Sequence, residues 1–187
     1  QDFWVKRFKK DIIHFLLFKK LRISKILDIF KFINYYLFFR ENRKHYIKKV
    51  VLKKKNNEEI TIPKILKNYD KVFLKVDIEG DEYKILDDIK KNSKKIIFLV
   101  IEFHSLHKNI KKIKKFLNKL DLKIIHIHAN NYGGIDKYGN PKVIELSLLN
   151  TKEIKVNNVF SKKQYPILNL DFKNFKRNDE IEIRFNE

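Results

Sequence analysis

The sequence predicts an α/β fold in which parallel strands are followed by an antiparallel hairpin and preceded by amphipathic helices. Two apolar runs, residues 71–77 and 96–102, have the length of buried strands. Residues 109–120 repeat apolar side chains at helical spacing, which predicts the crossover helix that a parallel connection requires. Two further strands, over residues 122–130 and 143–149, are joined by a loop alone, so we expect them to pair as an antiparallel hairpin.

The N-terminal segment, residues 2–39, carries apolar side chains every three to four positions, which predicts two amphipathic helices. We expect their apolar faces to cover the sheet, while a basic helix of this kind can also lie on a membrane surface. Charged residues such as Lys19, Arg22 and Asp28 interrupt the segment well short of the roughly 20 apolar residues that span a bilayer. We therefore expect no transmembrane segment.

The other elements carry weaker signals, and we expect all of them to belong to one domain of 187 residues. Within it we expect a helical flanking part over residues 1–60, a core over 61–150 and an irregular tail over 151–187. The expected smaller elements are a strand over residues 45–52, a charged loop over 53–59, a strand end and a short helical turn over 60–66, a helix over 81–91, a loop over 131–140 and a late edge strand over 181–185.

The composition is strongly basic, with 43 Lys and Arg against 23 Asp and Glu and a formal net charge of +20. Such a charge attracts nucleic acid, anionic membranes or acidic solutes without sequence specificity, and it also results from drift toward A/T-rich codons and Lys-coated surfaces. We expect no specific nucleic-acid partner. The absence of Cys excludes disulfides and thiolate nucleophiles and suits a reducing compartment, so we expect a cytoplasmic protein.

Polar side chains of catalytic type follow three successive strands. The first strand ends in Asp77 and Glu79, and the second in Glu102 and His104. The third carries three more such residues, His126, His128 and Asn130, and alternation along that strand predicts Leu122, Ile124, His126 and His128 on one face. If the three strands run in the same direction, their ends meet at one edge of the sheet, where α/β proteins bind ligands.

Each of these residues also has a purely structural explanation. Glu79 precedes a helix whose N-terminus favours a carboxylate, and His126 fits a satisfied core histidine. The set of two histidines and several carboxylates can in principle bind a divalent metal, but no tightly spaced motif such as HExxH is present, so we expect no metal. No nucleophile elbow or Walker phosphate loop occurs either, which argues against covalent hydrolysis and nucleoside triphosphate chemistry.

The stretch FLKVDIEGDEYKIL, which contains Asp77, Glu79 and Gly80, resembles the LKxDxEGxE signature of the FkbM-type S-adenosylmethionine-dependent methyltransferases. The segments LVIEFH, HIHANNYGG and PKVIELSLL follow it in the order and spacing of a bacterial branch of that family. The resemblance covers residues 72–149. It implies a partial class I, Rossmann-like methyltransferase sheet, with the signature on its fourth strand and the hairpin formed by its last two strands.

The same resemblance implies roles for the residues at the strand ends. Asp77, Glu79 and His104 are the expected catalytic residues, with a carboxylate or the imidazole removing a proton from an acceptor hydroxyl. Asp77 and Gly80 are expected beside the S-adenosylmethionine cofactor. The expected substrate-binding residues are Glu102, His128, Asn130 and Asn131. FkbM-type enzymes methylate hydroxyls of sugars, polyketides and other metabolites, so the expected partner is a small-molecule or glycan acceptor.

The chain departs from the class I pattern on the donor side. That pattern binds the donor on a glycine-rich turn after the first strand, but no glycine precedes Gly80. We interpret the chain as the C-terminal portion of an O-methyltransferase whose donor loop lies upstream. The alternative is a catalytically inactive binding or scaffold module with a basic surface for anionic glycan or nucleic acid.

Overall fold

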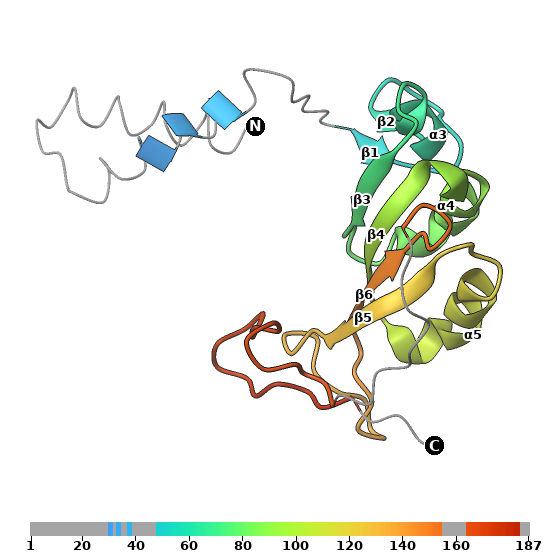
Figure 1. Ribbon diagram of the computed structural model, residues 1–187. Helices are drawn as coiled ribbons and strands as arrows, with labels where there is room; N and C mark the ends of the chain where they lie inside the picture. Colours follow the sequence, from blue (N-terminus) through green and yellow to red (C-terminus); the bar gives the residue numbers. More distant parts are fainter. Residues whose placement is uncertain (1–29, 32, 35–36, 39–47, 155–163, 184–187) are drawn as a thin grey trace, which may run out of the picture. The chain divides into compact units, whose positions relative to one another are not determined.

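A computed structural model describes residues 30–31, 33–34, 37–38, 48–154 and 164–183 (Figure 1). The chain divides into two units, residues 1–49 and 50–187. The described residues between 30 and 38 are helical, as predicted. The rest of the two amphipathic helices expected over residues 2–39 lies outside the described residues, and so do residues 45–47 of the strand expected over 45–52. Within its described part, residues 48–52, only Lys49–Val50 form a strand.

The larger unit is built on a four-stranded sheet with the order β3-β4-β6-β5. Strands β3 and β4 pair in parallel, whereas β6 is antiparallel to β4 on one side and to β5 on the other. The predicted hairpin of β5 and β6 is thus confirmed, and β6 lies between β4 and β5. As a result β3, β4 and β5 all run in the same direction. Their bounds are Val72–Val76 for β3, Ile96–Phe103 for β4, Lys123–Ala129 for β5 and Ile144–Leu149 for β6.

Smaller elements precede the sheet in the described part of this region. Strands β1 and β2 form a two-stranded ladder, and the short helix α3 follows with Pro63 in its first turn, where a proline costs no hydrogen bond. The strand end and helical turn predicted over residues 60–66 are therefore confirmed. The bounds are Lys49–Val50 for β1, Glu59–Ile60 for β2 and Ile62–Leu66 for α3.

The helix predicted over residues 81–91 is split in two. A 3₁₀ turn, η1 (Glu82–Lys84), comes first, and the α-helix α4 (Leu86–Lys91) begins after Ile85. The tighter turn accompanies the burial of the Glu82 side chain, which binds the backbone of the preceding turn. A second 3₁₀ turn, η2 (Ser93–Lys95), leads into β4. The crossover helix α5 (Leu106–Leu117) begins three residues earlier than the sequence predicts.

One hydrophobic core joins the three helices to one face of the sheet. On the strand side it contains Leu99, Ile101 and Phe103 of β4, all fully buried. Ile89 of α4 and Phe116 of α5 pack against them. On the opposite face the Phe73 and Phe98 rings stack 5.0 Å apart, and Phe73 stays 65 % exposed. Among the described residues, the helices thus cover one face of the sheet.

A β-bulge in β5 corrects the predicted alternation along that strand. Ile124 pairs with Leu148 and His126 pairs with Ser147, so Ile125 is the extra residue between them. Because of this insertion, Ile124 shares the face of Leu148, a core residue, while His126 and His128 share the face opposite the helices. The expectation that Leu122, Ile124, His126 and His128 lie on one face is therefore wrong.

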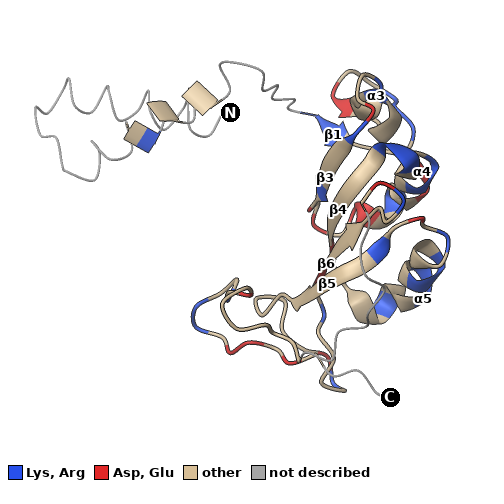
Figure 2. Ribbon diagram, in the orientation of Figure 1, with Lys and Arg blue, Asp and Glu red and all other residues tan. Residues whose placement is uncertain are grey.

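The C-terminal segment, residues 164–183, is irregular, as predicted, and a single bridge between Tyr165 and Ile183 stands where an edge strand was expected. Residues 184–185 of that expected strand lie outside the described residues. Lys residues are prominent along α4 and α5 (Figure 2). No helix within the described ranges has the length and apolarity needed to cross a membrane.

Candidate functional site

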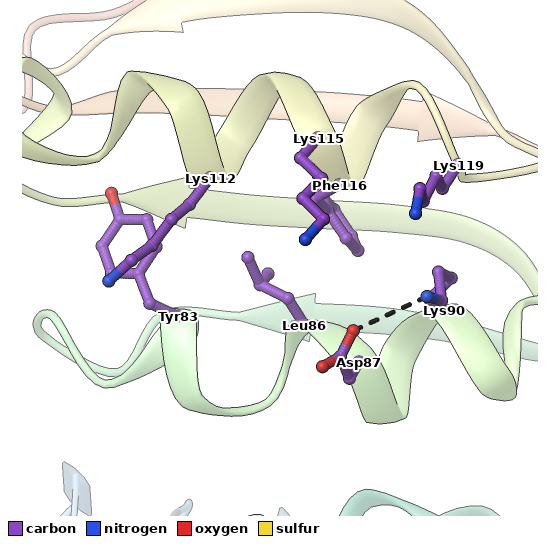
Figure 3. A pocket seen from close by; sticks show the side chains of 8 residues that line it. All are labelled: Tyr83, Leu86, Asp87, Lys90, Lys112, Lys115, Phe116 and Lys119. Carbon is purple, nitrogen blue, oxygen red and sulfur yellow. Dashed lines mark ion pairs between the residues drawn. The ribbon is translucent and has the colours of Figure 1, made fainter.

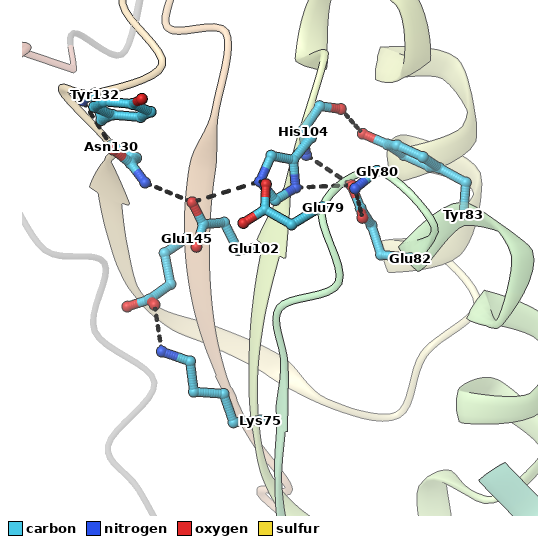
Figure 4. A network of polar contacts seen from close by, with 10 residues as sticks. All are labelled: Lys75, Glu79, Gly80, Glu82, Tyr83, Glu102, His104, Asn130, Tyr132 and Glu145. Carbon is cyan, nitrogen blue, oxygen red and sulfur yellow. Dashed lines mark hydrogen bonds and ion pairs between the residues drawn. The ribbon is translucent and has the colours of Figure 1, made fainter. Parts of the chain in front are cut away.

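The candidate site lies at the edge of the sheet where β3 and β4 end (Figure 4). Parallel pairing of these strands brings Asp77 beside Glu102 and His104, and one ligand atom from each of the three lies within 4.8 Å of the others. Asp77 is exposed, Glu102 is buried and His104 is partly buried. The sequence-based expectation that these strand ends meet is confirmed.

The turn after β3 carries Glu79 and Gly80 in the left-handed region, with φ angles of 53° and 99°. A Cβ at Gly80 would meet no atom within 4 Å, so backbone conformation rather than space favours glycine here. Glu79 is the strained residue of the pair, because a side chain disfavours this region. Its carboxylate is 86 % exposed and its Oε2 lies 3.4 Å from His104 Nε2. The turn therefore projects a solvated carboxylate toward the imidazole.

Glu82 holds the backbone of the site in place, a role that the sequence did not predict. Its side chain is fully buried, and its two oxygens accept hydrogen bonds from the backbone N–H of Gly80 (2.8 Å) and of His104 (2.7 Å). Glu82 Oε1 also lies 3.4 Å from His104 Nδ1. One carboxylate thus ties the turn after β3 to the end of β4. The available signal was the last Glu of the LKxDxEGxE pattern, which Glu82 matches.

Tyr83 fixes the other side of His104. Its phenolic O–H donates a hydrogen bond of 2.5 Å to the His104 carbonyl oxygen. Burial, together with the nearby charge of Glu82, holds the pKa of Tyr83 well above its usual range, so the phenol keeps its proton and remains a donor. Ser105, directly after His104, has a φ of 51° and is a second non-glycine residue in the left-handed region. Strained backbone therefore flanks the site on both strands.

Glu102 is held by the end of β5. Asn130 Nδ2 donates a 2.6 Å hydrogen bond to Glu102 Oε1, while Asn130 Oδ1 accepts from the backbone N–H of Tyr132. Burial is the main cause that raises the pKa of Glu102; the hydrogen bond from Asn130 opposes this shift, and the Asp77 charge adds to it. His104 Nε2 lies 3.9 Å from Glu102 Oε1. The three strand ends thus form one continuous polar network.

The remaining predicted substrate-binding residues contact the C-terminal segment. His128 Nε2 lies 3.5 Å from Glu180 Oε2. Asn131 is 1 % exposed, and its side chain exchanges hydrogen bonds of 2.8–3.0 Å with the backbone of Phe175 and Asn178. His126, on the same strand as His128, pairs with Asp171 at 2.7 Å. The structure therefore places Asp77, Glu79, Gly80, Glu102, His104 and Asn130 together, and ties His128 and Asn131 to residues 164–183.

Comparison with known families agrees with this geometry. Residues 30–132 match the family described as Methyltransferase FkbM domain, which is more than half of the chain. The chain belongs to the FkbM methyltransferase family. The match includes the signature turn, both strand ends of the site and Asn130. No curated protein and no solved structure matches the chain.

Within this family assignment, the site can take part in proton transfer and in recognition of a polar molecule. Its exposed members, Asp77 and Glu79, are open to a ligand. The backbone of the neighbouring His104 is held by two hydrogen bonds, one from Tyr83 and one to Glu82. No Lys or Arg in the described part of the chain forms an ion pair with Asp77, Glu79 or Glu102. The site is therefore anionic in a protein whose formal net charge is +20.

Proposed function

We propose that this FkbM methyltransferase is an S-adenosylmethionine-dependent O-methyltransferase that methylates a hydroxyl of a sugar or a related metabolite. The observation that supports the proposal most strongly is the convergence of Asp77, Glu102 and His104 within 4.8 Å at one edge of the sheet. A parallel pair followed by an antiparallel pair also agrees with the later strands of a class I methyltransferase sheet. The carboxyl edge of such a sheet is where ligands bind.

S-adenosylmethionine supplies a methyl group on a sulfonium, which passes to an acceptor oxygen and leaves S-adenosylhomocysteine. The anionic edge formed by Asp77, Glu79 and Glu102 fits a cationic group of this kind, because no Lys or Arg ion pair within the described ranges neutralises these residues. We assign Asp77 and the Gly80 turn to the donor side of this edge.

The protein's own task in the reaction is to orient the acceptor hydroxyl and to take its proton. Glu79 is exposed and able to reach an acceptor, and His104 is held so that Nε2 points toward Glu79 (Figure 4). Either group can accept the proton that the hydroxyl loses when the new C–O bond forms. Glu82 supports this role by holding the His104 backbone and facing Nδ1.

Asn130 and Glu102 are the residues that we assign to acceptor binding at the site. Both carry hydrogen-bonding groups beside the reacting edge, and Tyr132, 73 % exposed, adds an aromatic surface on the adjoining loop. His128 and Asn131 remain predicted substrate-binding residues. We propose that they act by holding residues 164–183 beside this loop, since that is where their contacts lie.

The test combines binding and methyl transfer in the full-length protein. Calorimetry should detect S-adenosylmethionine binding, and label from methyl-tritiated donor should enter an extract of metabolites and glycans from cells that lack the gene. Asp77→Ala and Glu79→Ala should each lower that transfer by about 100- to 10,000-fold with unchanged circular dichroism. Absence of donor binding, or wild-type transfer by both variants, would exclude the proposed chemistry.

A second candidate function, an inactive module that binds an anionic glycan or nucleic acid, is favoured by a basic groove between α4 and α5 (Figure 3). Lys115 and Lys119 of α5 lie opposite Lys90 of α4, which pairs with Asp87, and Lys112 lies over the Tyr83 ring at the other end of the groove. Leu86 and Phe116 add apolar surface to the lining. Such a module should bind heparin or RNA with an affinity that falls steeply with salt, and should not bind S-adenosylmethionine. Donor calorimetry therefore separates the two functions.

A further inference from the structure

We propose that Asp77, Glu102 and His104 form a binding site for one divalent metal ion. Their ligand atoms, one from each side chain, lie within 4.8 Å of one another, so small side-chain movements bring all three to the roughly 2.0–2.2 Å bonds of a first-row metal. Two carboxylates and one imidazole make a mixed oxygen and nitrogen set that suits Mn²⁺ and similar ions. The ligands come from the ends of two paired strands, which fixes their backbones.

The negative charge of the site would be balanced by a cation, and no Lys or Arg in the described part of the chain pairs with its carboxylates. Glu102 is only 7 % exposed, and the nearby carboxylates of Asp77 and Glu79 add further negative charge. Lys75, on the strand that leads to Asp77, binds Glu145 at 3.5 Å rather than a member of the site. A buried carboxylate without a cationic partner is unfavourable, and a metal ion would remove that cost.

The outer contacts have the arrangement that metal ligands require. His104 Nε2 points to the carboxylates, while Nδ1 lies 3.4 Å from the fully buried Glu82 without a hydrogen bond between them. A carboxylate near this ring nitrogen is placed to orient a ligating histidine after a small adjustment of the ring. Asn130 likewise holds one oxygen of Glu102 through its 2.6 Å hydrogen bond. His104 and Glu102, the two less exposed ligands, therefore each have a second side chain beside them that can position them.

Three protein ligands leave coordination positions open for an acceptor, and this part of the inference rests on the proposed function. The exposed side of the site, at Asp77 and Glu79, is where those positions face solvent. Two neighbouring hydroxyls of a sugar could occupy them, and a metal-bound hydroxyl loses its proton more readily. With His104 Nε2 on the metal, Glu79 is the group left to accept that proton. The acceptor class is then a vicinal diol.

Metal binding is tested directly with Mn²⁺ as the probe, using the full-length protein after chelator treatment. Electron paramagnetic resonance should show one equivalent of bound Mn²⁺. His104→Gln and Asp77→Asn should each weaken binding at least tenfold, and exposed Asp77 allows a variant that leaves the core intact. The matched controls are His107→Gln and Asp87→Asn, which make the same changes at exposed positions on α5 and α4 and should leave affinity unchanged.

The outcomes separate this inference from the proposed function. No saturable Mn²⁺ binding, or wild-type affinity in both His104→Gln and Asp77→Asn, overturns the metal site even if calorimetry detects S-adenosylmethionine. One equivalent of Mn²⁺ that both variants lose supports the metal site even if the donor does not bind. Circular dichroism of each variant verifies that a loss of Mn²⁺ binding reflects the ligand rather than unfolding.

Discussion

Replacing Glu82 by Gln should destabilise the protein by about 2 kcal/mol. The carboxylate is fully buried, and each of its oxygens accepts one backbone N–H, from Gly80 at 2.8 Å and from His104 at 2.7 Å. Gln keeps one acceptor oxygen and puts an NH₂ group against the other N–H. One charge-assisted hydrogen bond, which contributes about 1.5–3 kcal/mol, is therefore lost and a buried donor is left unsatisfied. For a chain of this size, about 2 kcal/mol corresponds to a fall in Tm of roughly 4–8 °C.

Urea unfolding followed by circular dichroism measures this change. The control is Asp87→Asn, an equivalent change on the adjoining helix, where the side chain is 75 % exposed and its ion pair with Lys90 is 3.6 Å long. Exposed pairs of this kind contribute at most about 1 kcal/mol. Methyl transfer by Glu82→Gln should also fall, because the same bonds hold the Glu79 turn and His104. A Glu82→Gln midpoint equal to that of wild type would refute the organising role of Glu82.

Three further predictions concern the parts that surround the site. Gly80→Ala should cost roughly 1–2 kcal/mol through its φ of 99° alone, since a Cβ there meets nothing; an unchanged urea midpoint would contradict this. Because burial raises the pKa of Glu102, the folded state binds its proton more tightly than the unfolded state and loses stability as pH rises through the raised pKa. In the presence of a chelator, Glu102→Gln should therefore raise Tm at pH 8 but not at pH 4. Equal Tm shifts at the two pH values would exclude the burial of ionised Glu102 as the cause. Asn131→Ala should lower Tm and speed proteolytic cleavage within residues 164–183, because three side-chain hydrogen bonds to Phe175 and Asn178 are lost. The exposed control Asn140→Ala should leave cleavage unchanged. Unchanged cleavage in Asn131→Ala would show that Asn131 does not hold this segment in place.

The sheet and the meeting of its strand ends could be predicted from local patterns. Apolar runs of strand length, a helical repeat after β4 and a helix-free loop after β5 determine which strands are parallel and which form a hairpin. Once those directions are known, Asp77, Glu102 and His104 must lie at one edge. The insertion of β6 between β4 and β5 needed the structure, because a hairpin can join a sheet by either of its strands.

The faces of β5 could not be predicted, because the run Ile124, Ile125, His126, Ile127 offers no clear alternation of apolar and polar residues. That run is equally compatible with regular pairing and with a bulge at Ile125. The choice depends on long-range contacts: Ile127 packs on the core, while His126 meets Asp171 in the C-terminal segment. A shift of one residue moves every later side chain to the other face.

The role of Glu82 and the contacts of Asn131, itself an expected substrate-binding residue, could not be predicted for a similar reason. In the sequence Glu82 is one acidic residue among several that precede a helix, and nothing local shows that its carboxylate is buried against the backbone of His104, 22 positions away. The sequence predicts Asn131 in a loop, but its hydrogen-bond partners Phe175 and Asn178 lie 44 and 47 positions further along the chain. Only the fold brings such groups together.

The most direct test of the proposed site is the rate of methyl transfer by Glu79→Gln in the full-length protein. This substitution keeps the size of the exposed side chain and removes only its charge and its ability to accept a proton. Transfer from methyl-tritiated S-adenosylmethionine into the metabolite extract should fall by about 100-fold or more, with donor binding and Tm close to those of wild type. A Glu79→Gln enzyme that transfers methyl groups at the wild-type rate would contradict the assignment of Glu79 as the proton acceptor at this edge.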